Sequence, residues 1–550
     1  MYNQLYTFVR YFYKSSIFSE LENLNFSVFT NYICLFMLEY RKRVNLMKKS
    51  FLALILFLFI QALFSKEVKI CSEPVEFLET FIPGSTNVST SFIDYEQLIS
   101  DLNYADYYLR TAYMGYKEMV DIGYKKQALL NYFENRYAGK ENIEVYEFVV
   151  DLYNFFQNFV KKDCHFILEF DNQRKYINVC NKGFFFYSNT FVEKQDGKYF
   201  VIETDCKALK PGDKYTGKDN YLFKYPAKGK NVYRLGCIDN AERKSCSFSF
   251  NNNAVDLDLH NDGAIDLTPS PKYHEIETND SVYISLSSFN IPDKNSPYRK
   301  GSDIVFEKFA NIRNRFIEKK NIIIDLRSNT GGREVYGEFA VWNFLNKNGE
   351  VFSEKSYRKM YEFLDSNFYR TSYIVSPAAL QARLQLFIKT GEEKTSYGKQ
   401  LQKKLKEFKK TPEKIIYENQ TTQKNEAKPY FDGNIIFLID RNTMSACERM
   451  IYLSKKLLNK DKVFVIGENS GGCAVYTDVL DYLLPGSGIS IRLGANYNSF
   501  YDDFAQWHGE GIGIFPDYWS TGENLNETIF LATEDKSMKE KLSKIGKRLY

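Results

Sequence analysis

The stretch Ile435–Tyr452, IIFLIDRNTMSACERMIY, joins an apolar run to an amphipathic one and indicates the fold of the chain. The apolar residues 435–439 stop at Asp440, and Ser445 opens a run whose apolar side chains recur at helical spacing. This pattern predicts a buried strand, a turn and a helix that begins at the serine. Such a serine exposes its hydroxyl beside the amides of the first helical turn, as a nucleophile next to an oxyanion site requires. The same position also suits a simple helix N-cap, so the local pattern leaves both interpretations open.

Two glycine-rich turns flank this segment in sequence. The apolar run 322–326 leads into DLRSNTGG, which ends at Gly331 and Gly332, and the run 463–466 leads into GENSGG. Parallel strands place such turns along one edge of a sheet, where α/β proteins build their sites. A glycine pair alone is usually simple turn geometry, but three such turns on consecutive strands favour a site. We expect a glycine amide of the first turn and the Ala446 amide to form an oxyanion hole. Glu448 is expected to be a favourable first-turn carboxylate of the helix.

An alternation of predicted strands and helices begins at Ser281. It is interrupted by the charged segment 351–430, which we expect to be a largely helical insertion. Its lysine-dense part, Lys399–Lys410, is typical of a solvated helix face.

The N-terminal part carries a targeting signal. Met47-Lys48-Lys49 precedes fourteen mostly apolar residues, and residues 47–65 have the layout of a cleavable signal peptide. Fourteen residues are short for a membrane span, which takes about twenty, although a retained signal anchor is the alternative. Because the signal starts at Met47, residues 1–46 are interpreted as a non-native upstream extension. The signal predicts export to a periplasmic or extracellular space, with membrane anchoring only if it is retained.

Composition excludes some classes of protein. A hydrophobic content of 44% with 26% charged residues is that of a globular protein, and a net charge of +4 over 550 residues indicates no nucleic-acid partner. Eight of the nine cysteines follow the signal, and an exported chain allows them to form disulfides. No C-x-x-C pair occurs, which argues against a zinc ribbon, and we expect no metal and no cofactor.

Two further units are expected before the α/β part. Residues 66–162 show helical periodicity, most clearly over 91–136 and 143–160, and predict an N-terminal helical unit. Residues 163–272 have short alternating runs separated by polar and glycine residues, and predict a β-rich module. This module shows no convincing PDZ pattern. The α/β domain then covers 273–550.

At this point the sequence resembles a known family. The order IIIDLRSNTGG, IIFLIDRNTMSACE, VIGENSGG and GEGIGIFPD is similar to that of the tail-specific (C-terminal processing) serine peptidases and their tricorn-like relatives. The resemblance implies a crotonase/ClpP-like α/β catalytic domain with Ser445 as the nucleophile. Cys447 stands where the family has a second serine.

The general base departs from one branch of that family. The processing branch uses a lysine just after the Gly-Glu-x-x-x-Gly turn, where this chain has Cys473. The tricorn-like branch, to which the chain is nearer, uses a histidine supplied from before the catalytic domain and a late glutamate. Resemblance to it implies His165, in Asp163-Cys164-His165, as the base and Glu510 as the residue that orients it. An imidazole suits this role because it exchanges a proton near neutral pH.

Alternatives stay open at this stage. His508 is a rival base, whereas His260 and His274 are expected to be surface and structural residues. Cys473 is either a packing residue or a partner for Cys447. The resemblance implies an exported serine peptidase that hydrolyses peptide or protein substrates by a Ser-His-Glu acyl-enzyme mechanism. The missing lysine leaves an inactive peptide-binding scaffold as the alternative, and an esterase is weaker because no Gly-x-Ser-x-Gly elbow is present. The sequence does not specify the oligomeric state.

Overall fold

The computed structural model describes residues 91–170, 175–178, 183–261, 272–367, 370–408, 414–420, 429–520 and 522–545. The predicted extension 1–46, the signal peptide 47–65, Cys71 and Cys180 lie outside these ranges. Within them, no helix combines the length and apolar character needed to cross a membrane.

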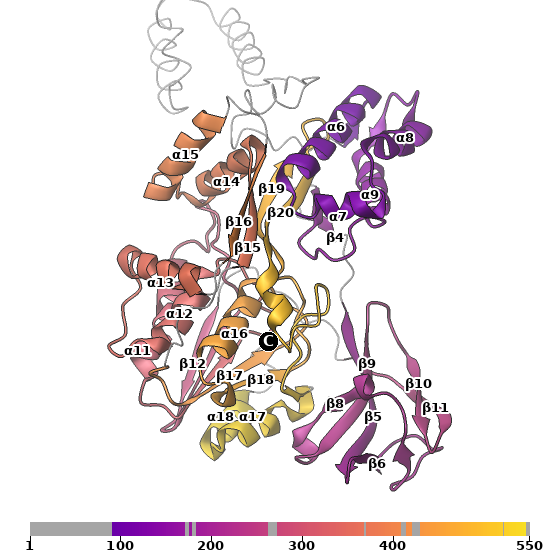
Figure 1. Cartoon of the computed structure of the whole chain (residues 1–550), viewed down its shortest axis with the longest axis vertical. Helices are drawn as coiled ribbons and strands as arrows, with labels where there is room; N and C mark the ends of the chain where they lie inside the picture. The colour runs from indigo at the N-terminus through magenta and orange to yellow at the C-terminus, as the bar shows by residue number, and fades with distance from the viewer. Residues whose placement is uncertain are drawn as a thin grey trace, which may run out of the picture. The chain divides into compact units, whose positions relative to one another are not determined.

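A six-stranded sheet lies at the centre of the α/β part (Figure 1). Its strand order is β12 (Tyr273–Glu277), β13 (Ser281–Leu286), β14 (Asn321–Asp325), β17 (Asn434–Ile439), β18 (Val463–Gly467) and β21 (Tyr518–Trp519). Only the β12–β13 pair is antiparallel, and every other neighbouring pair is parallel. The predicted α/β fold with parallel strands before all three turns is therefore confirmed.

Both faces of this sheet are covered by helices, which explains why its strands are apolar throughout. On one face, Ile323, Ile436 and Ile466 pack against α17 (Leu525–Thr533) and α18 (Lys536–Ile545). The alternate residues of the same strands are also buried and point to the other face. That face carries α12 (Val335–Leu345), which packs against α10 (Ser302–Ala310), α11 (Ile312–Phe316) and α16 (Ala446–Leu457).

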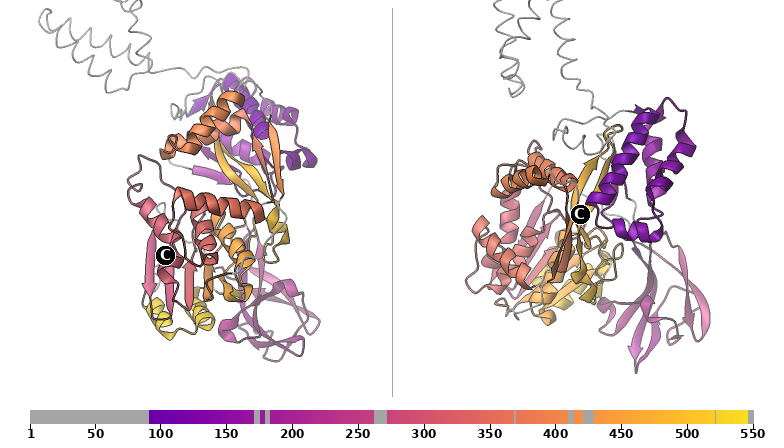
Figure 2. Two further views of the ribbon diagram at one scale, coloured as in Figure 1. Left: turned by 60° about the vertical axis from the view of Figure 1, so that its left-hand side comes forward. Right: turned by 45° about the horizontal axis from the view of Figure 1, so that its top comes forward.

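A second sheet joins segments that are far apart in the sequence. Its order is β16 (Ile415–Gln420), β15 (Arg370–Val375), β20 (Ser490–Asn498), β3 (Ile167–Phe170) and β4 (Lys175–Asn178), with β19 (Tyr476–Leu483) also paired to β20. Figure 2 shows its long C-terminal strands in yellow beside the orange strands of the insertion. The insertion 351–430 thus contains two strands besides its helices α13 (Glu354–Asn367), α14 (Pro377–Thr390) and α15 (Ser396–Phe408). The pairing of β3 with β20 fixes the chain just after His165 against the C-terminal part.

The predicted N-terminal helices are present as α6 (Tyr95–Ala112), α7 (Tyr116–Ile122), α8 (Lys126–Tyr137) and α9 (Val145–Phe156), with a short pair of strands, β1 (Phe92–Ile93) and β2 (Ile143–Glu144). Helix α6 begins with a capping box, in which Asp94 Oδ1 accepts the Gln97 amide at 2.7 Å and Gln97 Oε1 accepts the Asp94 amide at 2.9 Å. In the same helix the buried Asp101 carboxylate accepts the amides of Gly486 and Ser487 at 2.7 and 2.8 Å. This contact ties the helical unit to the turn between β19 and β20.

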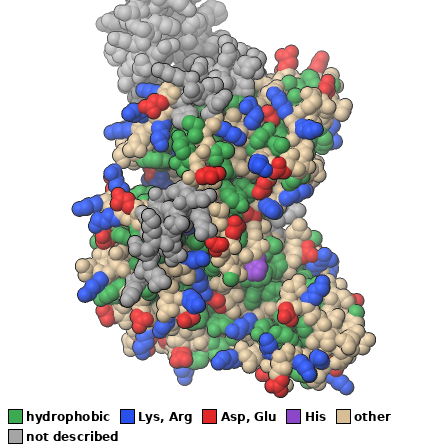
Figure 3. All heavy atoms as spheres, viewed as in Figure 1, with side chains coloured by type: hydrophobic (Ala, Val, Ile, Leu, Met, Phe, Trp, Pro, Cys, Tyr) green, Lys and Arg blue, Asp and Glu red, His purple; other side chains and the backbone are tan. Residues whose placement is uncertain are grey.

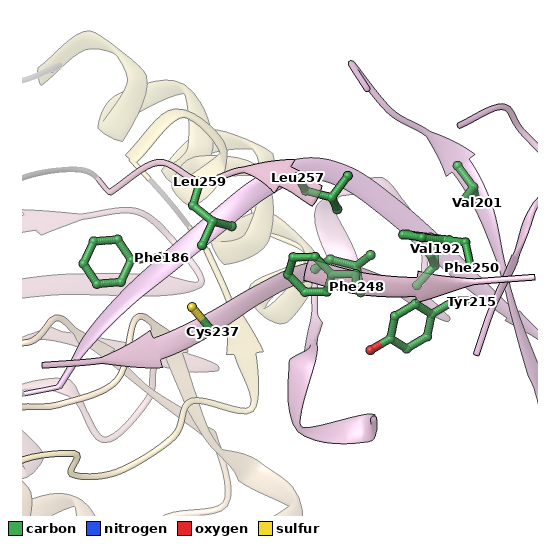
Figure 4. Packing of buried hydrophobic residues seen from close by; sticks show 10 residues of the cluster. Phe186, Val192, Val201, Tyr215, Cys237, Phe248, Phe250, Leu257 and Leu259 are labelled. Carbon is green, nitrogen blue, oxygen red and sulfur yellow. The ribbon is translucent and has the colours of Figure 1, made fainter. Parts of the chain in front are cut away.

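The β-rich part is a seven-stranded antiparallel sheet. Its strands are β5 (Phe184–Gln195), β6 (Lys198–Glu203), β7 (Lys214–Tyr215), β8 (Leu222–Lys224), β9 (Val232–Asp239), β10 (Ser245–Phe250) and β11 (Asn253–Asp258). Aromatic and aliphatic residues from these strands form its core, among them Phe186, Phe248 and Leu257 (Figure 4). The strands β3 and β4, within the predicted module 163–272, pair with the second sheet instead. On the surface, acidic and basic side chains are interspersed over the face seen in Figure 3.

Candidate active site

Ser445 occupies the turn between β17 and α16 and has an unusual backbone conformation. Its φ is 54° and its ψ is −116°, and its side chain is half-buried. A helix N-cap residue normally has an extended backbone with negative φ. A non-glycine residue at positive φ outside the left-handed helical region is strained, and such strain gathers at functional sites. Ser445 is thus the N-cap of α16, in a capping box with Glu448, and in addition has a strained backbone that a simple cap does not need.

The first glycine turn lies directly against this serine. A Cβ atom on Gly331 would be 2.7 Å from Ser445 Cβ and 2.8 Å from the Met444 carbonyl oxygen. Glycine is required there both by this close approach and by a φ of +90°. The loop is also fixed by the Met444 amide, which donates to the Asn329 carbonyl at 3.1 Å. The turns after β14 and β17 thus form one packed unit.

The two glycines of that turn differ in whether their backbone amides already donate a hydrogen bond. The Gly331 amide donates to Asn329 Oδ1 at 3.0 Å and is buried, whereas Gly332 is exposed. In the part of the chain that the structure describes, the Gly332 and Ala446 amides meet no hydrogen-bond acceptor. Of the two predicted glycine donors, Gly332 is therefore the one with an amide available to a ligand.

Glu448 connects the nucleophile turn to the third turn. Its fully buried carboxylate accepts the amides of Ser445, Gly472 and Cys473 at 2.9, 2.8 and 2.9 Å, and it also accepts the Ser470 hydroxyl. Burial raises the pKa of this carboxyl, and the four donors oppose that rise. Sequence reasoning expected only a first-turn carboxylate. The signal for a larger role was the Ser-x-x-Glu spacing of a capping box, which directs the glutamate back to the serine amide.

The segment that carries His165 reaches the same place. Cys164 packs against Met444 and Cys473 in a small buried cluster, so the residue before His165 contacts the residue before Ser445. His165 is half-buried with a buried Nδ1 atom, and its amide donates to Asp163 Oδ1 at 2.7 Å. Burial raises the pKa of Asp163 to about 7. The structure thus brings the Asp-x-His segment beside the nucleophile turn.

Glu510 joins this cluster from the late glycine-rich loop. Its Oε1 atom accepts the amides of Ala474 and Tyr476 at 3.0 and 3.3 Å, and also that of Val475. Its Oε2 atom is buried and, within the described residues, meets no donor. Burial holds the pKa of Glu510 well above its usual value, and Cys473 and nearby carboxyl groups add to the rise.

The remaining basic side chains have other surroundings. The ring of the rival base His508 is stacked on Phe515 with 3.5 Å between ring centroids, while His260 and His274 are exposed. Burial of the His508 ring lowers its pKa. Lys455, on α16, donates to the Val463 carbonyl at 2.6 Å and to Asp517 Oδ2 at 2.8 Å. These contacts engage Lys455 beside β18, away from the nucleophile turn.

The two cysteines that depart from the family pattern are both buried thiols with no disulfide bond. Cys447 Sγ lies 3.4 Å from the Asn329 carbonyl oxygen, to which it donates. Cys473 instead faces Cys164 and Glu510, and one ligand atom from each of the three lies within 4.8 Å of the others.

The chain is similar in sequence or in structure to several known proteins. Residues 280–519 match the model of peptidase family S41. No curated protein matches the chain. Among solved structures, mature CPAF is 13% identical with a TM-score of 0.35, and the match covers 80% of this chain and 98% of CPAF. The photosystem II D1 C-terminal processing protease is 10% identical with a TM-score of 0.31, over 78% of this chain and 94% of that protein. The tricorn protease is 11% identical with a TM-score of 0.26, over 82% of this chain and 37% of its own. The match of residues 280–519 to this family model identifies the chain as a serine-type peptidase.

Proposed function

We propose that the chain is an exported peptidase that works through an acyl-enzyme on Ser445, with His165 as the general base and Glu510 as the residue that orients the histidine. The observation that carries the proposal is the positive φ of Ser445 in a turn closed by Gly331. A simple cap needs neither the strain nor the close approach of a second backbone segment.

In the proposed first step, His165 takes the Ser445 hydroxyl proton as the oxygen attacks the peptide carbonyl carbon. The carbonyl oxygen becomes negatively charged, and we assign its stabilisation to the Gly332 and Ala446 amides, which meet no acceptor among the described residues, with Gly331 holding the loop. The imidazolium then returns its proton to the leaving amine, and an ester joins the substrate acyl group to Ser445. In the second step, His165 takes a proton from water as the water oxygen attacks the ester carbon. The proton then returns to the Ser445 oxygen, and the acid product is released.

The environment of Glu510 supports its proposed role. The carboxyl group is buried next to other carboxyl groups and a thiol, so its anionic form is disfavoured in the absence of a positive charge nearby. An imidazolium formed on His165 would be the counter-charge that this carboxylate lacks. Glu510 would thereby favour protonation of His165 in the transition state, as the carboxylate of a serine-protease triad does.

Export is proposed on the signal at 47–65, with peptide or protein substrates met outside the cytoplasm. The helical unit 66–162 and the β-rich module 163–272 are proposed as units that precede the catalytic domain 273–550, which contains the insertion 351–430. Edman sequencing of the secreted protein tests the export proposal. An N-terminus near residue 66 is expected, and a chain retained with residues 47–65 intact would contradict cleavage.

The mechanism is tested with Ser445→Ala, His165→Ala and Glu510→Gln in an assay on internally quenched peptide libraries. Removal of the nucleophile or the base should lower kcat/KM at least about 10⁴-fold, and Glu510→Gln should lower it about 10²- to 10⁴-fold. His274→Ala, a change at an exposed histidine, is the matched control and should keep full activity.

A second measurement separates the enzyme from an inactive binding scaffold. A peptidyl phosphonate that reacts with activated serines should label the wild-type chain at Ser445 and leave His165→Ala unlabelled. Peptide binding without labelling would contradict the catalytic proposal, and so would undiminished hydrolysis by Ser445→Ala or His165→Ala.

A further inference from the structure

Three side chains beside the proposed triad form a donor set of their own. One sulfur each from Cys164 and Cys473 and one carboxylate oxygen of Glu510 all lie within 4.8 Å of one another. They come from three separate segments: the segment just before β3, the glycine turn between β18 and β19, and the late glycine-rich loop. Both cysteines are buried, and Glu510 presents a buried Oε2 atom that no donor in the described chain satisfies.

We propose that Cys164, Cys473 and Glu510 form a site for a borderline-soft divalent metal ion, with Zn²⁺ as the ion that fits best. The sequence predicts no metal, because no two of these residues are spaced as a recognisable ligand pair. Only the fold brings them together.

The donor types select the class of ion. Thiolates bind Zn²⁺ and other soft or borderline ions, whereas Mg²⁺ and Ca²⁺ prefer an all-oxygen shell. Two thiolates and one carboxylate supply three of the four tetrahedral ligands of Zn²⁺, and water can complete the set. The thioether-bearing Met444 packs against both cysteines and keeps the surroundings apolar.

The distances suit such an ion after a small contraction. With Zn–S bonds of ~2.3 Å and tetrahedral angles, two sulfur ligands lie ~3.8 Å apart. The three donor atoms are within 4.8 Å. The sulfur pair therefore needs to approach by at most about 1 Å and each sulfur–oxygen pair by at most about 1.2 Å, which is within reach of side-chain rotation.

All three proposed ligands are acids in their metal-free form, so metal binding is coupled to the loss of their protons. Binding would release one proton from each thiol, and one more from Glu510 where that carboxyl is protonated. Binding of one divalent cation would therefore release two or three protons from the site.

Metal binding has a consequence that rests on the proposed function. Glu510 cannot hold the metal and orient His165 with the same oxygen, so an occupied site should be an inhibited peptidase. Removal of the metal by a chelator would free the Glu510 carboxylate to orient His165 again, so the inhibition should be reversible.

The test uses the full secreted chain, freed of metal by a chelator and reduced. Equilibrium dialysis against Zn²⁺ should give one tightly bound ion per chain, and Co²⁺ as a probe should show the sulfur-to-metal charge-transfer absorption of two thiolates. Cys473→Ser and Glu510→Gln should each weaken Zn²⁺ binding at least tenfold. The matched control is Cys447→Ser, which alters another buried thiol of the same region and places there the residue that the family resemblance predicts; its binding should be unchanged.

Several results would overturn the proposal. They are Zn²⁺ binding by the wild-type chain that is no stronger than binding by Cys473→Ser, a Co²⁺ spectrum without thiolate absorption, or a Cys164–Cys473 disulfide in the non-reduced protein with no uptake of metal after reduction.

Phosphonate labelling of Ser445 with and without Zn²⁺ separates the two proposals. Labelling that proceeds without any Zn²⁺ binding contradicts only the metal site, and Zn²⁺ binding by a chain that never labels contradicts only the catalytic mechanism. Equal labelling rates with and without bound Zn²⁺ would contradict the inhibition.

Discussion

Removal of the Glu448 carboxylate should loosen the turns around the nucleophile more than any other single truncation on α16. The carboxylate is fully buried and accepts three backbone amides and one hydroxyl, at Ser445, Ser470, Gly472 and Cys473. In Glu448→Ala these four donors lose their acceptor while the surrounding backbone stays in place. The change therefore acts on two turns at once, the one between β17 and α16 and the one between β18 and β19.

The expected magnitude follows from the number of donors. Four hydrogen bonds to a charged acceptor would be worth about 6–12 kcal/mol if nothing offset them. Relief of the buried charge and entry of water reduce this, and at ~1 kcal/mol per stranded donor the net loss is about 4 kcal/mol. Glu448→Gln keeps one oxygen and turns an amide group toward two donors, so about 2 kcal/mol should be lost.

Urea unfolding followed by tryptophan fluorescence measures these losses. The free energy of unfolding should fall in the order wild type, Glu448→Gln, Glu448→Ala, and kcat/KM should fall with it because Ser445 loses its backbone anchor. Glu147→Ala, at an exposed position of α9, is the control and should stay within about 0.5 kcal/mol of wild type. A Glu448→Ala variant within 1 kcal/mol of wild type would refute the reasoning that these four bonds hold the turns together.

Three further changes probe the same architecture. Ser445→Gly should abolish hydrolysis yet raise the free energy of unfolding by about 1 kcal/mol, because glycine accepts a φ of 54° without strain; an unchanged or lower stability in urea would argue against stored strain. Gly331→Ala should lower kcat/KM at least about tenfold and lower stability by about 2 kcal/mol or more, since its methyl group would meet backbone at 2.8 Å; near wild-type kinetics would contradict the close approach. Burial raises the pKa of Asp101 from 3.8 to about 6, so the folded chain binds the carboxyl proton more tightly than the unfolded chain does. The stabilisation from this proton is therefore fully present below pH 3.8 and is lost as the pH rises through 6. Between pH 4 and 7 the loss should be about 3 kcal/mol, seen as the difference in the pH slope of unfolding between wild type and Asp101→Asn, and parallel slopes would contradict it.

Local patterns were sufficient to predict much of this fold. The apolar run before Asp440 and the helical spacing after Ser445 depend on neighbours in sequence, and they predicted β17, the turn and α16 correctly. Long-range pairing could not be predicted in this way. Nothing near Ile167 indicates that β3 pairs with Arg492 and its neighbours in β20, because strand partners are chosen by tertiary packing.

The site shows the same division. The candidate nucleophile and its glycine turns carry motifs, whereas the backbone angles of Ser445 and the four partners of Glu448 exist only in the folded chain. The contact of Cys164 with Met444 and Cys473 was equally hidden, because thiols that pack together leave no spacing to recognise. These contacts are the ones that place the Asp-x-His segment beside the serine.

The strand order of the second sheet also determines when, during synthesis, the proposed site can form. Strand β3 follows His165 directly, but its partner β20 (Ser490–Asn498) comes much later in the sequence. During synthesis, the segment after the histidine therefore has no strand partner until β20 has been made. On the proposed mechanism the serine cannot meet its base before then, so an emerging chain is protected from its own activity by the order in which its strands become available.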